Sequence, residues 1–362
     1  MIMSTSDRII STRKNSAQPV LARRTERGWS QADLARHAGI SRTAVSAIEG
    51  DRLAPSVTTA LSLAAVLECS VEELFARGET CAPRSAQWAW TPRVEPCRYW
   101  EAEVSRQRLL YPVEALSVNP VPHDGVWTAG VCREAGPAPA DTTLTLACCD
   151  PAAGLLATEY ARFSGFRLLV FPRGGRAALE LLRRRLVHVA GLHYATDEQP
   201  ERNAGMVRAQ LPGRWELLRS ARWEEGIALP ANDQTRSTKS VARCRRRWAA
   251  REPGSGAREC MDELLGNRPF AGRQVDGHPA VAEAVRAGWA EAGVCVRFSA
   301  DEAGLNFLPV RTEALDLCFA SALQHDPRLQ ALVRLLRSRS HRRLISELPG
   351  YDARETGEIR AL

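Results

Sequence analysis

The chain has 362 residues, of which 44% are apolar and 25% are charged, which is typical of a folded globular protein and excludes a disordered or fibrous one. This length predicts two or three domains, and the formal net charge of +7, carried almost entirely by arginine, favours a polyanionic partner. The sequence has neither a secretory signal nor an apolar run of membrane-spanning length, so we expect a cytoplasmic protein with no membrane partner.

The first readable segment follows an N-terminal arm at residues 1–16 and covers residues 17–77. Basic residues exceed acidic ones by eight to two between Arg8 and Arg42, which suits a surface that neutralises phosphates. Apolar spacing and helix-capping residues predict five short helices, an all-α domain. Their expected ranges are 21–27, 31–37, 42–49, 56–67 and 71–75.

The second and third of these helices form a helix-turn-helix pattern. Ser30 and Ser41 are natural N-caps, and Gly39 permits the tight turn between the helices. The segment GWSQADLARHAGISRTAVSAIEGDRLAPSVTTALSLAAVLECSVEELF closely resembles the Cro/C1-type (XRE family) DNA-binding domain. The resemblance implies a homodimer on double-stranded DNA with the third helix in the major groove. It also implies base contacts from Arg42, Thr43 and Ser46 and phosphate contacts from Gln31, Ser41 and Arg52.

Residues 78–141 are expected to form a connector with short strands. Segments YWEAEV and LLYPVEALSV are the candidate strands, and proline-rich turns separate them. Trp88, Trp90 and Trp100 need buried surroundings, so we expect an ordered bridge that packs on the following domain.

From residue 142 to residue 362, apolar strand segments alternate with helical segments, which predicts an α/β domain with helices on the faces of a sheet. The expected strands are TLTLACC, FRLLVF, VHVAGLHY, WELLRSARWEEGIAL, RRRWAARE, AGVCVRF and ALDLCFA. The expected helices are PAAGLLATEYARF, GGRAALELLRRRL, 256–265, 279–287 and 327–344.

Three strand-to-helix junctions in this domain have the chemistry of anion cradles. A helix N-terminus offers free N–H groups and a partial positive charge, and glycine lets a ligand approach the backbone. The residues we expect to bind an anion at these junctions are Cys149, Asp150, Arg173, Gly174, Gly175, Arg176, Arg251, Gly254, Ser255, Gly256 and Arg258. His193, at the end of a strand, is a further candidate donor to the ligand.

The segments VAGLHYATD, ARWEEGIAL, REPGSGAR and LPGYD resemble the periplasmic-binding-protein-like domain of some bacterial regulators, over residues 144–352. This resemblance implies the two-lobed type II substrate-binding fold, which closes on a cleft. Related domains are described as molybdate-binding, whereas this chain has Gly174-Gly175-Arg176 where serines are common. A carboxylate or other organic anion is therefore as good a candidate as molybdate or tungstate.

The sequence thus predicts a ligand-responsive transcription regulator rather than an enzyme, with no cofactor and no metal site. The sequence lacks three common motifs of enzymes: the GxSxG nucleophile motif, the GxxxxGK[ST] phosphate loop and the HExxH metal motif. The ten cysteines show no spacing of a structural zinc site and are expected to be reduced. One alternative is a thiol or soft-metal sensor centred on Cys148 and Cys149, and another is a DNA-binding scaffold without a ligand.

Overall fold

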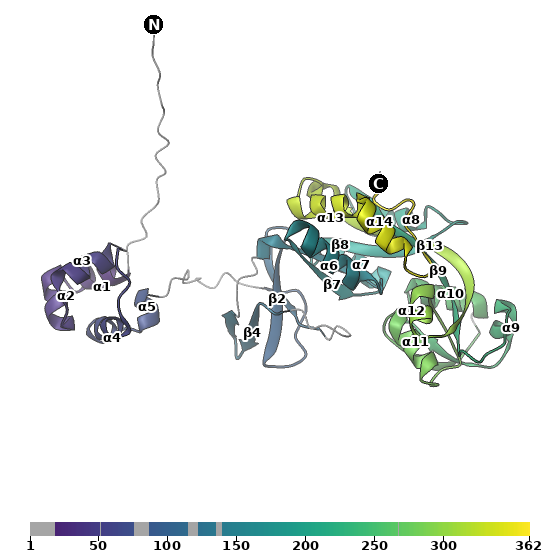
Figure 1. Cartoon of the computed structure of the whole chain (residues 1–362), viewed down its shortest axis with the longest axis horizontal. Coiled ribbons are helices and arrows are strands. Elements are labelled where there is room, and N and C mark those ends of the chain that lie inside the picture. The colour runs from purple at the N-terminus through teal and green to yellow at the C-terminus, as the bar shows by residue number, and fades with distance from the viewer. Residues whose placement is uncertain (1–18, 51, 76–86, 115–121, 135–139, 267) are drawn as a thin grey trace, which may run out of the picture. The chain divides into compact units, whose positions relative to one another are not determined.

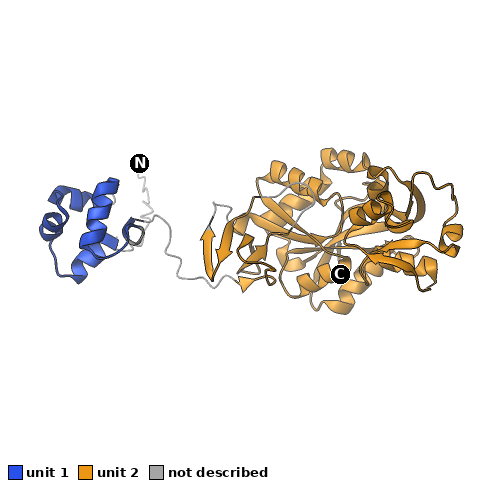
Figure 2. Ribbon diagram, turned by 90° about the horizontal axis from the view of Figure 1, so that it is seen from below, with its two compact units in different colours: residues 1–85 blue, residues 86–362 orange. Residues whose placement is uncertain are grey.

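A computed structural model describes residues 19–50, 52–75, 87–114, 122–134, 140–266 and 268–362. Contacts divide the chain into two compact units, residues 1–85 and residues 86–362 (Figure 2). None of the helices in these described ranges is long and apolar enough to cross a membrane.

The first unit is a bundle of short helices around one apolar core. Its helices are α1 (Pro19–Glu26), α2 (Gln31–Ala38), α3 (Arg42–Glu49), α4 (Val57–Val66) and α5 (Val71–Phe75). The Ser30 side chain accepts a hydrogen bond from the Asp33 N–H, and Gly39 ends α2 with φ of 67°. Ser41 caps α3 in the same way as Ser30 caps α2. These caps set the ends of both helices of the helix-turn-helix pair.

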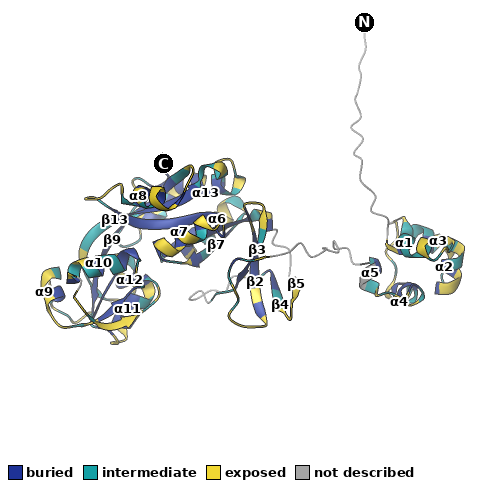
Figure 3. Cartoon of the chain, turned by 180° about the vertical axis from the view of Figure 1, so that it is seen from behind, coloured by how far each residue is buried: buried dark blue, intermediate teal, exposed yellow. Residues whose placement is uncertain are grey.

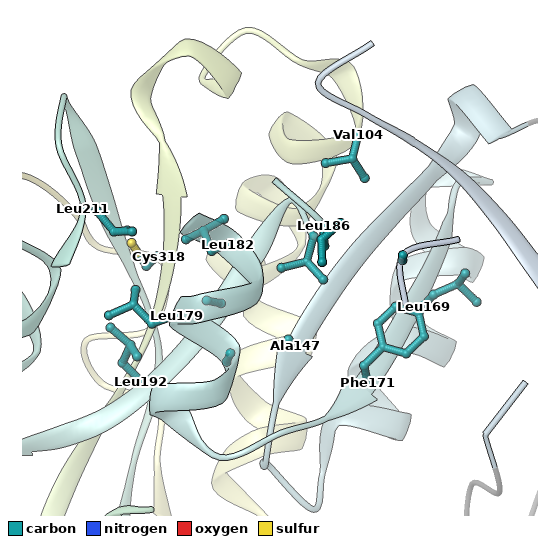
Figure 4. Packing of buried hydrophobic residues seen from close by; sticks show 14 of the residues in the cluster. Val104, Ala147, Leu169, Phe171, Leu179, Leu182, Leu186, Leu192, Leu211 and Cys318 are labelled. Atoms are coloured by element: carbon teal, nitrogen blue, oxygen red, sulfur yellow. The ribbon is translucent and has the colours of Figure 1, made fainter. Parts of the chain in front are cut away.

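The second unit begins with a five-stranded sheet in the order β1-β3-β2-β4-β5. Its strands are β1 (Gln87–Trp88), β2 (Cys97–Val104), β3 (Gln107–Pro112), β4 (Gly125–Thr128) and β5 (Val131–Glu134). Figure 4 shows Val104 of this sheet near Leu186, within the apolar cluster that also contains Phe171 and Leu182. The Tyr111 hydroxyl donates to the Leu186 carbonyl at 2.8 Å. The connector strands therefore belong to the same compact unit as the α/β part.

The rest of the second unit is a two-lobed α/β domain on a ten-stranded sheet (Figure 1). The path through this sheet runs β11-β10-β12-β9-β13-β8-β6-β7, and β14 and β15 pair with β9. The first lobe contains η1 (Ala140–Thr142), β6 (Thr143–Cys148), α6 (Ala153–Ser164), β7 (Arg167–Pro172), α7 (Gly175–Arg183), β8 (Val189–Thr196), α8 (Arg202–Gln210), η2 (Ser321–Leu323), α13 (Pro327–Arg337) and α14 (Arg339–Ser346). The second lobe contains α9 (Thr238–Arg243), β10 (Arg247–Ala250), α10 (Gly256–Leu265), β11 (Ala271–Gln274), α11 (His278–Arg286), β12 (Ala292–Val296) and α12 (Arg297–Glu302).

Two long antiparallel strands, β9 (Trp215–Leu229) and β13 (Asn306–Ala320), run through both lobes. The short strands β14 (Tyr351–Asp352) and β15 (Ile359–Ala361) lie along β9. Every residue of β6 and β12 is buried, as is β8 up to its last residue, whereas the edge strand β11 is exposed throughout. Figure 3 shows exposed residues along the outer helices, such as α9 and α11. The helices therefore cover the sheet, and the chain crosses between the lobes on continuous strands.

The structure corrects two of the expected elements. The single helix expected at 327–344 is divided into α13 and α14, because Ser338 adopts an extended backbone and its side chain caps α14 by accepting from the His341 N–H. The strand expected at ALDLCFA begins eight residues earlier, at Asn306, where β13 pairs with the end of β9.

Candidate functional site

Two of the predicted anion cradles, one from each lobe, lie against each other. A Cβ added to Gly174, at the start of α7, would lie 2.3 Å from Glu252 Oε1, and one on Gly254 would lie 2.8 Å from Arg176 Cδ. The Tyr194 hydroxyl donates to the Gly254 carbonyl at 2.6 Å and accepts from the Arg176 N–H at 3.0 Å. A side chain at Gly174 would displace the end of the Glu252 side chain, and Gly254, with φ of 85°, adopts a backbone conformation that favours glycine. The lobes are thus closed against each other at this junction.

Arg251 lies at this junction and is only 3% exposed. Its Nε and Nη2 donate to Glu252 at 2.8 and 2.9 Å, but its Nη1 has no hydrogen-bond acceptor among the described residues. Burial opposes the charge of Arg251, yet the nearby Cys149, Glu252 and Glu225 outweigh burial and raise its pKa. A buried cationic donor without an acceptor is costly unless a ligand completes it.

His278, the first residue of α11, supplies a second buried donor without an acceptor. Its Nδ1 accepts a hydrogen bond from the Val296 N–H at 3.3 Å, so the ring proton resides on Nε2 in the neutral form. Burial and then the charge of Arg251 lower the pKa of His278 well below its usual value, so the ring is neutral. Its Nε2 has no partner among the described residues. Two free N–H donors therefore stand in a buried position, which favours an acceptor-rich ligand.

A chain of three hydrogen-bonding side chains reaches the same place from the first lobe. Cys149 Sγ lies 3.0 Å from His193 Nε2, and His193 Nδ1 lies 2.7 Å from Glu313 Oε2. The Trp223 Nε1–H donates to the same carboxylate oxygen at 3.2 Å. Burial lowers the pKa of His193, but Cys149, through charge and hydrogen bond, and Glu225 outweigh burial and raise it. The imidazole is thus fixed between a thiol and a carboxylate.

A second buried carboxylate adjoins this chain and is balanced by Arg311. The Arg311 Nε donates to Glu313 at 2.7 Å, and its Nη2 donates to Glu225 at 3.2 Å. Burial and the neighbouring Glu313 carboxylate raise the pKa of Glu225 well above its usual value, whereas Arg311 acts to lower it. The raised pKa favours the protonated form of Glu225, which lowers the negative charge that Arg311 has to balance.

A cavity of about 590 Å³ shares two walls with this cluster. Trp223 is one wall, and Tyr351, whose hydroxyl donates to Asp150 at 2.5 Å, is the other. The arginines that line the cavity are already paired with carboxylates: Arg222 with Asp197, Arg297 with Glu224, and Arg354 with Asp352. We therefore consider the unpartnered donors at the lobe junction, rather than this mixed-charge cavity, to be the better anion site.

Several predicted ligand residues have their side chains engaged elsewhere. Arg173 pairs with Glu114, the last residue of the described range 87–114, and its guanidinium lies 5.1 Å from the centre of the Trp90 ring. Arg258 pairs with Asp262 at 2.9 Å. Ser255 caps α10, and the backbone of Gly175 approaches the Tyr194 ring, as that of Gly256 approaches His193. The predicted residues that come together at the junction are Cys149, Gly174, Arg176, His193, Arg251, Gly254, Ser255 and Gly256.

The same cluster also contains three potential metal ligands. The ligand atoms of Cys149, His193 and His278 lie within 4.8 Å of one another, a set suited to zinc or copper. However, the Val296 N–H occupies His278 Nδ1, which leaves a proton rather than a lone pair on Nε2. The positive charge of Arg251 also disfavours a second positive charge beside His278. The residues therefore fit an anion better than a cation.

Cys148 and Cys149 diverge although they are adjacent. Cys148 packs in an apolar cluster of the first lobe with Leu146 and Tyr160. Burial is the largest of several effects that raise the pKa of the Cys148 thiol well above its usual value. Both cysteines are free thiols. Only Cys149 reaches the polar cluster.

In the first unit, the residues expected to touch DNA are presented by α3 and its flanks. Arg42 and Thr43 are exposed, and Arg42 pairs with no carboxylate among the described residues. Ser46 is half-buried and lies beside the Arg52 guanidinium, 3.5 Å away. The Gln31 side chain donates to Glu49 at 2.8 Å, and Glu49 also pairs with Arg24 at 2.6 Å.

The residues that the sequence reasoning missed are His278, Glu313, Glu225, Trp223, Arg311, Tyr194 and Tyr351. One signal for two of them was present in the sequence. Glu225, which follows Glu224, and Glu313 lie in strand segments with apolar neighbours, where a buried charge must find a partner. His278 follows Gly277 and precedes a proline at a helix start. Nothing local indicates that these positions meet.

Comparison with known families matches both units. A model described as "Helix-turn-helix" matches residues 20–74, and a model described as "PBP superfamily domain" matches residues 157–337, half of the chain. The uncharacterized protein YvgK of Bacillus subtilis (strain 168) is 30% identical over 183 residues. That match covers 47% of this chain and 58% of YvgK.

Solved structures with a similar arrangement include two binding proteins. One is a putative phosphate ABC transporter substrate-binding protein with bound phosphate from Clostridium perfringens, with 10% identity, a TM-score of 0.46, and coverage of 57% of this chain and 97% of that one. Another is PhnD1 from Prochlorococcus marinus (MIT 9301) in complex with methylphosphonate, with 11% identity, a TM-score of 0.42, and coverage of 58% and 92%.

Proposed function

Because the chain belongs to the PBP superfamily domain family and also carries a helix-turn-helix segment, we propose that it is a DNA-binding regulator that binds a small anion between its lobes. The observation that carries the ligand part is the pair of buried donors without acceptors, Arg251 Nη1 and His278 Nε2, at the lobe junction. Oxygens of an anion would satisfy both donors, and the helix N-termini of α7 and α10 would add favourable partial charge.

The ligand is an oxyanion such as molybdate or tungstate, or an organic carboxylate. Each of these offers several acceptor oxygens and a negative charge that Arg251 would balance. A small ligand is favoured, because the backbones of Gly174 and Gly254 lie close to side chains of the opposite lobe. Anion binding would therefore favour the closed arrangement of the lobes, and the ligand would shift the protein between an open and a closed state.

For the DNA-binding half, we propose that α3 enters the major groove with Arg42, Thr43 and Ser46 at base edges. Gln31, Ser41 and Arg52 would lie toward the phosphates. A homodimer would bring two copies of α3 to a two-fold operator. Lobe closure would change the separation of the two copies, and the ligand would alter DNA affinity only as far as it binds the two states differently.

A thermal-shift screen tests the ligand part of this proposal. The purified full chain is heated with molybdate, tungstate, phosphate, sulfate, small carboxylates and soft metals, each in turn. An anion at about a hundredfold over its Kd stabilises the folded protein by about 2.7 kcal/mol. We expect Arg251→Met to abolish this shift and the surface variant Arg286→Met to retain it, because the ion pair of Arg286 is with Glu283 on the same helix, α11.

The second candidate function, a soft-metal sensor, is favoured by the proximity of Cys149, His193 and His278. It predicts that zinc or copper stabilises the protein, that the anions do not, and that Cys149→Ser removes the effect. Cys148→Ser would leave it in place, because Cys148 faces the apolar core. Stabilisation by metal alone would replace the anion proposal.

A further inference from the structure

Cys149 stands in the geometry of an activated thiol, which neither the DNA-binding nor the anion-binding function requires. The order thiol, imidazole, carboxylate is fixed by the 3.0 Å contact from Cys149 Sγ to His193 Nε2 and the 2.7 Å contact from His193 Nδ1 to Glu313. A nucleophile within reach of a base that a third group orients is the arrangement that activates thiols. Trp223 and Arg311 hold Glu313 in turn, so the orientation of the imidazole is over-determined.

The two unpartnered donors give this thiol a binding place for a reactant. A ring nitrogen of His278 lies within 4.8 Å of the ligand atoms of Cys149 and His193, and the Arg251 charge acts on Cys149. Both side chains are more than nine-tenths buried and have a nitrogen without an acceptor. A small molecule with oxygen acceptors would be held by these donors beside the sulfur.

We propose that Cys149 is a site of two-electron oxidation by small hydroperoxides, with His193 as the proton donor to the leaving group. The thiolate attacks the terminal peroxide oxygen, the O–O bond breaks, and the departing oxygen takes the Nε2 proton of the His193 imidazolium. The products are a Cys149 sulfenic acid and an alcohol, or water from hydrogen peroxide. The sulfur loses two electrons and the peroxide gains them. Arg251 and His278 stabilise the negative charge that develops on the departing oxygen.

The neighbouring cysteine shows why this chemistry belongs to one position. Cys148 lies in the apolar cluster of the first lobe, where burial raises the pKa of its thiol, and it has no imidazole partner among the described residues. Cys244 is exposed and represents an ordinary surface thiol of this chain. Both serve as internal references for Cys149.

The test is sulfenic acid trapping on the reduced full chain. The protein is treated with hydrogen peroxide in the presence of dimedone, and the labelled cysteines are identified and quantified over time by peptide mass spectrometry. We expect Cys149 to be labelled first and much faster than Cys244. Glu313→Gln, which keeps the shape and removes the charge, should lower the Cys149 rate by about a hundredfold. Cys148→Ala should leave the rate unchanged.

Two results would overturn the proposal: labelling of Cys149 no faster than that of Cys244, or an unchanged Cys149 rate in both Glu313→Gln and His193→Gln when circular dichroism shows these variants folded. A final experiment separates the thiol proposal from the proposed anion binding. It is the only part of the test that rests on the proposed function. An anion that stabilises the protein should protect Cys149 from labelling, since it would occupy the same donors. If no anion binds but Cys149 is still labelled fast, the anion proposal fails and the thiol proposal stands.

Discussion

Arg42 in the first unit and Arg251 in the second carry the same charge in opposite surroundings. Arg42 is exposed at the start of α3 and is surrounded by water, so its charge costs little until DNA arrives. Arg251 is 3% exposed, so burial disfavours its charge, and the nearby Cys149, Glu252 and Glu225 stabilise that charge. Substitutions on the DNA-binding surface should therefore change function at nearly constant stability. Substitutions in the lobe junction should change both, because buried charges there depend on one another.

The largest effect is expected from Glu313→Ala, which tests this interdependence. The variant leaves His193, Arg311 and the Trp223 N–H without their common acceptor in a fully buried place. Breaking a buried ion pair by removing one partner costs about 3–5 kcal/mol. Urea unfolding monitored by near-ultraviolet circular dichroism measures the loss. Glu313→Gln is the matched control, because it keeps the shape and one acceptor oxygen and removes only the charge. It should cost less than Glu313→Ala, and a Glu313→Gln variant as stable as the wild type would show that the charge is unimportant.

A pH effect of somewhat smaller size is expected from His188, which joins the five-stranded sheet to the first lobe. Its Nε2–H donates to the Glu103 carbonyl at 2.8 Å, and its Nδ1 accepts from the Thr145 N–H at 3.0 Å. Burial, followed by the charge of Arg328, lowers the pKa of His188 to about 4 from an ordinary value of 6.5. The unfolded chain therefore binds a proton between these values while the folded chain does not.

The stability contributed by His188 is consequently complete above about pH 6.5 and is lost as the pH falls toward about 4, with a total of about 3 kcal/mol. Unfolding free energies measured across this range for the wild type and for His188→Gln isolate the effect as a difference in slope. His193, whose pKa is raised, contributes in the opposite direction and is present in both proteins. Parallel pH profiles for the two proteins would contradict the prediction.

On the DNA-binding surface, Arg42→Ala should leave the melting temperature unchanged and weaken binding by about 1–3 kcal/mol at sites with guanine under this side chain. Operator sites selected in vitro from random DNA with the wild type supply the probes, and gel-shift titration measures the affinities. Arg52→Ala is the comparison, since a phosphate contact should weaken all sites alike. If Arg42→Ala weakened binding to all DNA sites equally, Arg42 would not take part in base recognition.

The two units also differ in how far their structure could be predicted from sequence. In the first unit, Ser30 and Ser41 cap helices through contacts within three residues, so local patterns locate α2 and α3. In the second unit, the strand and helix periodicity predicts the two-lobed α/β fold, and the glycine junctions that were predicted as cradles do meet. The resemblance of both parts to known families supported these predictions.

The polar cluster itself was beyond sequence reasoning, since its contacts depend on strand register. Glu313 lies 120 residues from His193 and pairs directly with Trp223 across β9 and β13. A shift of one residue in that register would turn the carboxylate to the other face of the sheet. Arg258 is the opposite case, because its partner Asp262 lies four residues ahead on the same helix, a pairing that the sequence contains.

The smallest effect is expected at Glu259, which links the lobes at the edge of the junction. This α10 carboxylate accepts from Arg176 at 2.9 Å and from Arg202 at 2.5 Å, both on the first lobe. Arg176 is mostly exposed, so water screens its pair, and the two contacts together are worth no more than about 1 kcal/mol, or about fivefold in the opening equilibrium.

Glu259→Gln should therefore leave the melting temperature nearly unchanged and raise the rate at which iodoacetamide alkylates Cys149 by up to about fivefold, because alkylation requires the lobes to open. Glu283→Gln is the matched control, since the ion pair of Glu283 is with Arg286 of the same helix, α11, and does not link the lobes. The lobes would be held by the Tyr194 to Gly254 hydrogen bond and apolar packing alone if both variants were alkylated at the wild-type rate. In that case the ion pairs of Glu259 would stabilise neither the closed arrangement of the lobes nor the folded protein. Exposed charges would then differ from buried ones in their effect on lobe opening as well as in their effect on stability.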